Sequence, residues 1–425
     1  MSQTYDCVVI GGGPAGSTVA TLVAQKGHKT LLVERTRFPR FHIGESLMPE
    51  TYWVFKRLNM LPKMKASHFV KKYSVQFTNA SGKDSQPFYF DAKVPHECSQ
   101  TWQIVRSEFD QMMLDNAAEH GVEVWSETNV ADVLLEPSGG DLPKATGVVV
   151  TRPGEEPRTI NAKVVVDATG TNALLSKKLN IRKRDPMLRK AAVFSHYRGA
   201  RRDEGKNEGA TLVLATPNQD GWFWYIPLPN DIVSIGVVGE PERLLQNRGT
   251  PEQVLEEEIR NCRGLEGRMA NAQRVAEVRV LSDFSYRATR CAGDGWVLVG
   301  DAFGFLDPIY SSGVFLAMKS GQMAADAITE AFAKNDFSAE QLGKWGPELS
   351  EGMQAIRKIV YAYYTKGFSF GRFVRAFPEH QHKITELLVG DVFRPEIKTV
   401  FEALETMIPL PTPIPLESPA PAAVS

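Results

Sequence analysis

The chain has 425 residues, of which 43% are hydrophobic and 23% are charged, so it can bury a large core and should form two or three structural domains. Its formal net charge of −1 gives no sign of binding to nucleic acid or to an anionic membrane surface. We predict a cytoplasmic protein without a metal site, disulfide, signal peptide or membrane span, because the four cysteines are scattered, the histidines form no metal-binding motif and no apolar run approaches the roughly 18 residues of a transmembrane helix.

The first predicted element is a short apolar strand, Cys7–Ile10, which runs directly into a glycine loop. Gly11 permits the tight turn, Gly13 lets a pyrophosphate approach the backbone, and Gly16 lets the following helix pack closely on the strand. This helix, predicted over Ser17–Lys26, would direct its free N–H groups and the positive end of its dipole at the phosphates.

A second strand, Thr30–Val33, ends on Glu34, about 20 residues after the glycines. A carboxylate at this position accepts hydrogen bonds from ribose hydroxyls and disfavours the 2′-phosphate of NADP. The strand, the glycine loop, the helix and the acid together predict a dinucleotide site on a parallel sheet. The alternative is a glycine-rich turn in another α/β fold.

The stretch Arg35–Ser46 contains Pro and Gly residues that break helices, so we expect a loop. Arg40 would either reach a cofactor phosphate or be a surface arginine. The tripeptide Gly44, Glu45 and Ser46 is a candidate for close backbone approach to a flat ligand. Helical spacing resumes over Leu47–Leu61.

Beyond this loop, the segment His68–Phe77 contains a pair of lysines followed by an alternating strand pattern. From composition alone, Lys71 and Lys72 are predicted to be surface charges. Antiparallel strands are predicted in Ser74–Phe90 and Glu97–Val105. The next segment, Arg106–His120, is a predicted helix whose first residue either binds a cofactor phosphate or ribose or has a plain capping role.

The strands Val122–Trp125 and Val130–Leu135 follow, and Lys163–Asp167 is an apolar strand of the buried parallel type that ends on the small residues Ala168–Gly170. We therefore predict that residues 1–185 are the first part of a nucleotide-binding domain with a sheet-rich insertion.

Residues 186–281 are predicted to form a second domain with an antiparallel sheet. Trp222 and Trp224 lie one residue apart in a strand and so face the same side, either as core aromatics or as walls for a flat ligand. The predicted elements are the strands Ala191–Tyr197, Thr211–Leu214, Gly221–Ile226 and Ile232–Val238 and the helix Pro251–Cys262.

Residues 282–335 return to the nucleotide-binding domain. The buried strand Trp296–Val299 leads to Asp301, which would either bond a ribityl hydroxyl or be a turn residue. The loop Pro308–Gly313 opens a helix, so the N–H groups of Ser312 and Gly313 should point into the site and bind an anion.

A helix is predicted over Ala317–Ala333, at the end of this segment. Residues 336–406 are predicted to form a C-terminal helical region, with two helices within Ser338–Val374, where an aromatic stripe is most simply helix packing. Residues 407–425 are rich in proline and have little that could pack, so we predict a polyproline-like or disordered tail.

Three motifs in this order, Gly11–Gly16 with Glu34, Asp167–Gly170 and Gly300–Ala302, resemble the FAD-binding fold of p-hydroxybenzoate hydroxylase and its relatives. The fold class predicted from this resemblance is α/β, with a Rossmann-like FAD-binding domain, an antiparallel-sheet substrate domain and C-terminal helices. The resemblance, in which the glycine loop lies near the N-terminus, implies that the dinucleotide is FAD and not NAD.

Within that superfamily the chain resembles the flavin-dependent halogenases over most of residues 1–375. Trp222–Pro227 fits the family's W-x-W-x-I-P motif, and Asp307–Val314 fits its flavin and halide loop. His68–Phe77 fits the region of the essential lysine, and the spacing to the flanking phenylalanines selects Lys72 over Lys71.

The resemblance implies that reduced FAD forms a hydroperoxide with O2, that halide held by Ser312 and Gly313 attacks it, and that the hypohalous acid reaches the catalytic Lys72. Trp222 and Trp224 would keep the organic substrate away from the flavin. The full set of predicted cofactor contacts is Gly11, Gly13, Ala15, Gly16, Glu34, Arg40, Gly44, Glu45, Ser46, Arg106, Val130, Asp301, Pro308, Gly313 and Val314.

Tyr310 stands where the indole-specific members carry a glutamate, so the resemblance favours a phenol or pyrrole as acceptor, either free or tethered to a carrier protein. The absence of a second clear G-x-G-x-x-G implies a separate NAD(P)H-dependent flavin reductase that supplies reduced FAD. Three alternatives remain: a flavin-dependent monooxygenase, a reductase resembling geranylgeranyl reductase, and a flavoprotein that binds FAD without this chemistry.

Overall fold

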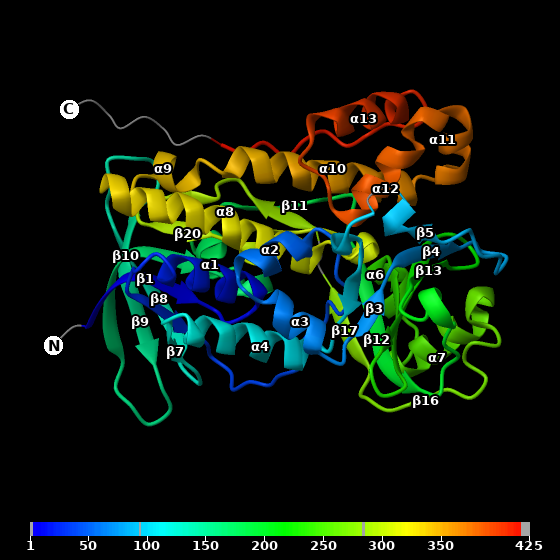
Figure 1. Cartoon of the computed structure of the whole chain (residues 1–425), viewed down its shortest axis with the longest axis horizontal. Coiled ribbons are helices and arrows are strands. Elements are labelled where there is room, and N and C mark those ends of the chain that lie inside the picture. The colour runs from blue at the N-terminus through cyan, green and yellow to red at the C-terminus, as the bar shows by residue number, and fades with distance from the viewer. Residues whose placement is uncertain (1–2, 93–94, 283–284, 418–425) are drawn as a thin grey trace.

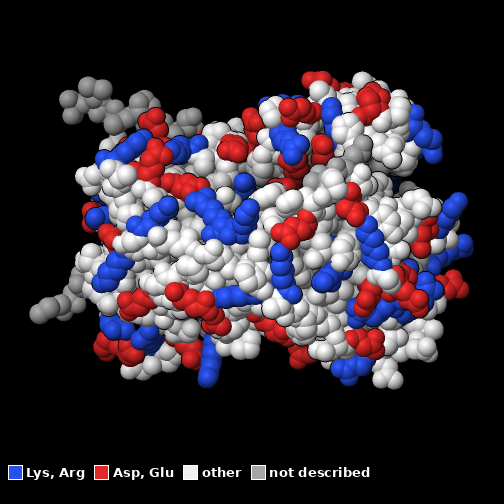
Figure 2. Space-filling view, in the orientation of Figure 1, with Lys and Arg blue, Asp and Glu red and all other residues white. Residues whose placement is uncertain are grey.

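The computed structural model describes residues 3–92, 95–282 and 285–417. Figure 1 shows a parallel-sheet region with α1 and α4 at one end of the molecule, an antiparallel sheet with α7 at the other end, and the C-terminal helices along the top. Positive and negative side chains are interspersed over the face drawn in Figure 2, in keeping with a net charge of −1.

The nucleotide-binding region is built on a parallel sheet whose strands are rich in β-branched residues and are buried on both faces. β1 (Gln3–Ile10) lies between β2 (Thr30–Val33) and β10 (Arg158–Asp167), and all three run parallel. The sheet continues through β7 (Glu123–Trp125) on one side and β20 (Trp296–Leu298) and β19 (Ala292–Gly293) on the other, and β9 (Lys144–Thr151) and β8 (Asn129–Glu136) extend β10 as an antiparallel pair.

Three helices hold this sheet in place. α1 (Pro14–Ala24) begins at the glycine loop, three residues earlier than predicted, because Pro14 is suited to the first helical turn. α4 (Arg106–Glu119) confirms the predicted helix, with Phe109, Met113 and Ala117 buried. α8 (Gly313–Lys334) packs against α1 so closely that a Cβ at Gly321 would lie 2.7 Å from the carbonyl oxygen of Ala15.

The second sheet has the strand order β16-β12-β15-β14-β13-β4-β5, with β17 paired to β12. Its centre confirms the four predicted strands, and the short helices α6 (Pro241–Leu245) and α7 (Pro251–Asn261) pack against it. The strands are β4 (Ser74–Thr78), β5 (Phe88–Tyr89), β12 (Ala191–Arg198), β13 (Thr211–Ala215), β14 (Gly221–Leu228), β15 (Ile232–Gly239), β16 (Gln273–Arg274) and β17 (Arg279–Ser282).

This sheet crosses the predicted boundary at residue 186, because β4 pairs in parallel with β13 through Val75 and Thr211. The alternating pattern of His68–Phe77 is also not one strand. It divides at Tyr73 into β3 (Val70–Lys72), which pairs with β6 (Thr101–Gln103), and β4. The division into domains stays a prediction, since a linear pattern does not reveal which strands pair.

Two further predicted segments are shorter in the structure. The helical spacing of Leu47–Leu61 gives a single helix, α2 (Thr51–Arg57), and α3 (Leu61–Ala66) begins at the last residue of that segment, because Pro49 and Pro62 set where the helices begin. Residues Glu97–Ser99 form a 3₁₀ turn and not the start of a strand, with the His96 side chain accepting from the Cys98 N–H at 3.0 Å.

A small sheet joins β11 (Arg182–Arg184), β18 (Tyr286–Ala288) and β21 (Gly304–Phe305).

The C-terminal region contains α9 (Ala339–Gly343), α10 (Gly346–Tyr364), α11 (Phe370–Ala376), α12 (Gln381–Val389) and α13 (Lys398–Glu405). The prediction of two helices within residues 338–374 is therefore wrong, because the short α9 precedes α10 and glycine at position 367 separates α10 from α11. No helix of the described residues is long and apolar enough to cross a membrane.

The prediction that the proline-rich tail has little that could pack is wrong for part of residues 408–417, where Ile408 is buried and Leu410 and Leu416 pack against the core. Arg357 donates to the carbonyl oxygen of Thr412 at 2.7 Å, Arg287 donates to that of Ile414, and the Glu417 N–H donates to the carbonyl oxygen of Thr289 at 2.8 Å. Buried arginines thus hold the backbone of an extended segment that has few side chains to bury. The rest of the tail, residues 418–425, lies outside the described part of the chain.

Candidate functional site

The glycine loop after β1 has the close packing that its sequence predicts. Gly11 has φ +107°, and a Cβ there would lie 2.5 Å from the carbonyl oxygen of Ala168. A Cβ at Gly16 would lie 1.9 Å from the carbonyl oxygen of Gly11. A Cβ at Gly13, in contrast, would meet only Arg40 within 4 Å, at 3.8 Å. The loop therefore offers a backbone surface with space above it at the start of α1, where Ala15 is buried.

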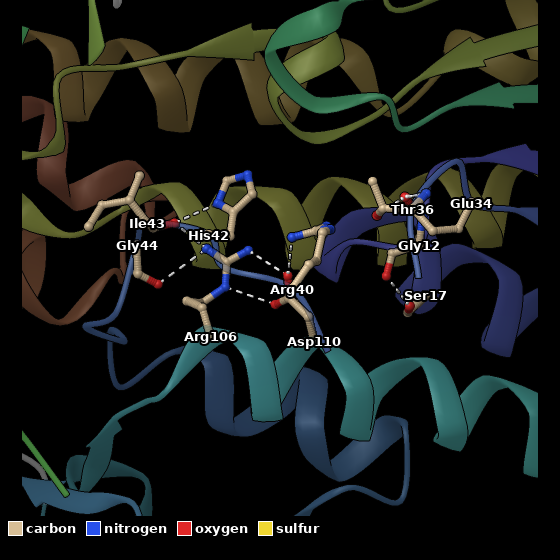
Figure 3. Close-up of polar contacts among 10 residues, drawn as sticks. All are labelled: Gly12, Ser17, Glu34, Thr36, Arg40, His42, Ile43, Gly44, Arg106 and Asp110. Atoms are coloured by element: carbon tan, nitrogen blue, oxygen red, sulfur yellow. Dashed lines mark hydrogen bonds and ion pairs between the residues drawn. The ribbon is translucent and has the colours of Figure 1, made fainter. Parts of the chain in front are cut away.

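Glu34 is fixed beside this loop (Figure 3). One carboxylate oxygen accepts from the Gly12 N–H at 2.8 Å, and the other accepts from the N–H and the hydroxyl of Thr36 at 2.8 and 2.7 Å. The backbone carbonyl of Glu34 accepts from the Thr128 N–H at 2.9 Å. This contact places Val130, a predicted cofactor contact, two residues along the chain from the partner of Glu34. The acid is thus held rigidly at the end of β2, with lone pairs left for a ribose hydroxyl.

Two arginines share one buried carboxylate that sequence reasoning missed. Arg106 donates to both oxygens of Asp110, at 2.8 and 3.0 Å, and Arg40 donates to Asp110 at 3.2 Å, as Figure 3 shows. Asp110 has no exposed surface. The signal for this contact was the i,i+4 spacing of Arg106 and Asp110 on α4.

The pair of arginines extends along the segment before α2. Arg106 also donates to the carbonyl oxygens of Ile43 and Gly44, the latter at 3.3 Å. Because Arg40 lies beside the glycine loop and Arg106 beside Gly44, the Asp110 carboxylate orders two cations along one wall, which is suited to a diphosphate-containing ligand.

Asp301 lies beyond the end of β20, next to the start of α1, since a Cβ at Gly300 would lie 2.9 Å from that of Ala15. Burial raises the pKa of Asp301 to about 7, against the opposing charge of Arg106. A carboxyl in this state gains from a hydroxyl partner, as a ribityl chain would supply.

The loop before α8 leads into a helix start with open space above it. Ser311 has φ +57°, and a Cβ at Gly313 would meet no atom within 4 Å, although Ser312 and Val314 are buried. The Ser312 hydroxyl is buried without a hydrogen-bond partner. The N-terminus of a 22-residue helix thus faces space with its N–H groups free, which suits an anion or the electron-rich edge of a flavin.

The turn that carries this loop is held by Asp307, which accepts from the Ile309 N–H at 3.1 Å across Pro308. Its other carboxylate oxygen accepts from the Tyr364 hydroxyl at 2.9 Å. Burial raises the pKa of Asp307 to about 6, and the bonds to Tyr364 and Ile309 act in the opposite direction. The loop that opens α8 is therefore anchored to the C-terminal helix α10.

Tyr364 also connects this anchor to the tryptophan pair. The indole N–H of Trp222 donates to the Tyr364 hydroxyl at 2.7 Å, and that of Trp224 donates to Ser234 at 3.0 Å. The two indole rings are 6.2 Å apart and both are buried. Sequence analysis interpreted the aromatic stripe of α10 as packing alone, and the polar role of Tyr364 depends on tertiary contacts that no local pattern reveals.

Lys72, which composition alone would place on the surface, is 3% exposed. Its ammonium nitrogen donates to the Ser46 hydroxyl at 2.9 Å and to the carbonyl oxygen of Leu47 at 3.1 Å, and it lies 5.5 Å from the centre of the Phe90 ring. Burial lowers the pKa of Lys72 to about 7. The adjacent Lys71 is exposed, so the structure separates the two lysines sharply.

The tripeptide Gly44, Glu45 and Ser46 joins the two halves of the site. Gly44 contacts Arg106, and a Cβ there would lie 3.6 Å from Val314, while Ser46 contacts Lys72. Glu45 accepts from His196 on β12 at 2.7 Å, and its other oxygen is buried without a partner. Sequence reasoning did not identify His196, because a lone histidine in a strand carries no spacing signal.

The residues present fit FAD on three observations: the open glycine loop, the unpartnered hydroxyl of Ser312 and the vacant space over Gly313. Among the described residues no group of three or more His, Cys, Asp or Glu side chains could hold a metal ion.

Comparisons with known proteins agree with this arrangement. The sequence profile of the tryptophan halogenase family matches residues 6–98 and 86–369. A 1H-pyrrole-2-carbonyl-[peptidyl-carrier protein] brominase of Pseudoalteromonas luteoviolacea is 34% identical over 92% of this chain and 93% of its own length. The corresponding chlorinase of Pseudomonas fluorescens is 30% identical over 95% of this chain and 93% of its own length. The structure of the flavin-dependent brominase Bmp2 superposes with a TM-score of 0.84 and 31% identity, covering 95% of this chain and 99% of that one.

Proposed function

The chain belongs to the tryptophan halogenase family of flavin-dependent halogenases, and from this membership we propose that it halogenates a pyrrole or phenol, with Lys72 as the relay. It is a flavin-dependent enzyme that uses FAD, O2 and halide. The observation that carries the relay assignment is the burial of Lys72, whose amine is held by two hydrogen bonds and has a pKa lowered to about 7.

Bound reduced FAD, with O2, supplies the oxidising equivalent that converts halide into hypohalous acid. The open glycine loop and Glu34 bind the adenosine end, and Arg40 and Arg106 neutralise the phosphates. Asp301 accepts from the ribityl chain. Because Asp110 pairs with both arginines, it limits their net positive charge and orients them.

Halide binds at the start of α8, where the N–H groups of Ser312 and Gly313 meet the positive end of the helix dipole. The space over Gly313 and the unpartnered Ser312 hydroxyl support this position.

Trp222 and Trp224 form a rigid wall that separates the organic substrate from the flavin, which prevents direct hydroxylation. A Cβ at Gly236 on β15 would lie 2.3 Å from the ring of Trp224, so the indole lies directly on β15. Lys72 receives the hypohalous acid and presents the halogen to an electron-rich ring.

Two relatives that act on a pyrrole tethered to a peptidyl carrier protein support a carrier-bound acceptor for this chain as well. The predicted phenol alternative rests on Tyr310, whose hydroxyl donates to the Ile359 carbonyl oxygen at 3.1 Å, so no carboxylate base stands at this point of the loop. A separate flavin reductase supplies reduced FAD.

The test is an assay of the purified protein with FAD, a flavin reductase, NADH and either bromide or chloride. Acceptors are free pyrroles and phenols and the pyrrole-2-carbonyl thioester of a carrier protein. We expect a halogenated product that depends on halide, O2 and reductase. A product that is only hydroxylated, whatever the halide, would favour the monooxygenase alternative, and reduction of an alkene without O2 would favour the reductase.

A further inference from the structure

Ser46 lies at the centre of a buried chain of polar side chains that ends on Lys72. Its hydroxyl is 2.9 Å from the Lys72 nitrogen and 2.9 Å from the Thr211 hydroxyl, which in turn accepts from the Gln103 amide at 2.8 Å. All four side chains are at most 4% exposed. They come from four separate parts of the fold, namely the segment before α2, β3, β6 and β13, so their convergence is a property of the tertiary structure.

The two hydrogen bonds of Lys72 leave one position of its nitrogen without a hydrogen-bond partner in the described part of the chain. A tetrahedral amine nitrogen has one bond to carbon and three further positions, and Lys72 uses two of these to donate to Ser46 and to the Leu47 carbonyl oxygen. A backbone carbonyl and a hydroxyl held by Thr211 are both fixed acceptors. The third position therefore has a fixed direction.

We propose that Ser46 is a positioning residue that, together with the Leu47 carbonyl, aims the remaining position of the Lys72 nitrogen at the incoming hypohalous acid. This inference rests on the proposed role of Lys72 as the relay. It gives Ser46, predicted from sequence as a cofactor contact, a task in the transfer of halogen. Through Gly44 the same tripeptide touches the flavin side of the site, so one short segment orders both ends of the transfer.

In the neutral amine the aimed position is the lone pair. The lone pair bonds to the halogen of hypohalous acid, the oxygen–halogen bond breaks, and the leaving hydroxide takes one amine proton to form water, which leaves an N-haloamine on Lys72. Burial lowers the pKa of Lys72 to about 7, so neutral amine is present near neutral pH. The ammonium form has an N–H in that position and cannot take part in this step.

Three charged residues lie next to this cluster in the chain, and each is paired through at least one atom or is exposed. Glu45 beside Ser46 accepts from His196, Asp91 beside Phe90 pairs with Lys206 at 2.7 Å, and Lys71 is exposed. Desolvation is the cause that acts on the pKa of Lys72. The pH response of the amine is thus governed by burial and by its two hydrogen-bond acceptors.

The experiment compares Ser46→Ala with the wild type in kcat, in substrate KM, in FAD affinity and in the pH dependence of halogenation. We expect kcat to fall on the order of tenfold to a hundredfold, as for a misdirected reactive group, with KM and FAD affinity retained. The acidic limb of the pH profile should move to lower pH, because Ser46 accepts a hydrogen bond that favours the ammonium form. Ser46→Thr keeps the hydroxyl and should restore most of kcat.

Ser195→Ala is the matched control, since this buried serine donates only to backbone carbonyls, that of Ala276 at 2.8 Å. It should leave kcat and the pH profile unchanged. If Ser46→Ala fails to fold, Thr211→Val removes the hydroxyl that holds Ser46 and should change kcat in the same direction. Wild-type kcat and pH profile in Ser46→Ala would overturn the inference.

An NMR titration of the protein with ¹³C-labelled lysine side chains separates this inference from the proposed function. The signal absent in Lys72→Ala identifies Lys72, and its pKa should be lower in Ser46→Ala than in the wild type. An unchanged pKa contradicts the bond to Ser46 even if halogenation is never observed. Absence of halogenation by the wild type with every acceptor contradicts the proposed function alone.

Discussion

Lys72 combines two properties that rarely occur together: a basic side chain and nearly complete burial with no acidic partner among the residues that the structure describes. Taking an ammonium group out of water is costly, and the hydroxyl of Ser46 and one carbonyl oxygen offset only part of that cost. A chain that retains such a residue loses stability for it. This is the residue-level argument for a chemical role, since a packing role would be filled better by methionine or leucine.

The same cost should make the stability of the protein depend on pH. The pKa of Lys72 is about 7 in the folded protein and 10.5 in an unperturbed lysine, so the unfolded chain binds more protons between these values. The free energy of unfolding should therefore rise with pH through this window, by up to about 1.4 kcal/mol per pH unit. Below about pH 7 the penalty is complete.

Denaturant unfolding of Lys72→Met measures this penalty directly. The variant should be more stable than the wild type near neutral pH, and its advantage should shrink toward pH 10, because Lys72 of the unfolded wild type also loses its proton there. Lys71→Met, which changes an exposed neighbour, should show no such trend. Parallel pH curves for the wild type and Lys72→Met would show that Lys72 is not a buried base.

At the scale of elements, α10 holds the loop that opens α8, the proposed halide site, from outside the nucleotide-binding region. Tyr364 accepts from Trp222 at 2.7 Å and donates to Asp307 at 2.9 Å, so one hydroxyl joins the C-terminal helix, the tryptophan pair on β14 and this loop. Trp222 and Asp307 are buried and Tyr364 is half-buried, and each has a hydrogen bond to lose.

Tyr364→Phe should therefore weaken halide binding. Without the hydroxyl, the Trp222 N–H and one Asp307 oxygen lose their partner, at a cost of about 1–3 kcal/mol for an unsatisfied buried group, and the turn before Ser312 is less well held. We expect a higher KM for halide and a lower free energy of unfolding, with FAD affinity retained. Steady-state kinetics at varied bromide concentration provides the measurement.

Tyr361→Phe is the matched control on the same helix. The Tyr361 hydroxyl donates to Asp185 at 2.6 Å and lies beside Arg357, away from the halide loop. This variant should lower stability and leave the halide KM unchanged. Equal effects of both variants on that KM would show that α10 acts through general stability and not through Asp307.

Across the whole molecule, the elements with strong periodic patterns were predictable from sequence, and their partners were not. The buried strands β1, β2 and β10, the helix α4 and the four central strands of the second sheet match the predicted segments. The pairing of β4 with β13 and the separation of β3 from β4 at Tyr73 depend on tertiary contacts. The tail up to residue 417 is held by buried arginines whose targets are backbone carbonyls, which carry no sequence signal.

The site shows the same division. Gly11 and Glu34 were predictable because they belong to one motif: Gly11 has φ +107° and a close backbone neighbour, and Glu34 ends the strand that follows the glycines. Asp110 and Tyr364 were not, because each acts through a side chain whose partner lies on another element. The choice of Lys72 over Lys71 came from family spacing, and the burial of one and exposure of the other give that choice a physical basis.

The proposed relay role of Lys72 is tested most directly by measuring two products in one reaction, the brominated aromatic substrate and a halogenated scavenger of free hypohalous acid. The reaction contains FAD, flavin reductase, NADH, bromide, an accepted aromatic substrate and the scavenger. We predict that Lys72→Ala loses aromatic bromination by at least about a hundredfold, the scale of a positioned reactive group, while it still binds FAD and delivers halogen to the scavenger. Lys71→Ala should behave as the wild type. Bromination of the aromatic substrate by Lys72→Ala at the wild-type rate would contradict the relay role of Lys72.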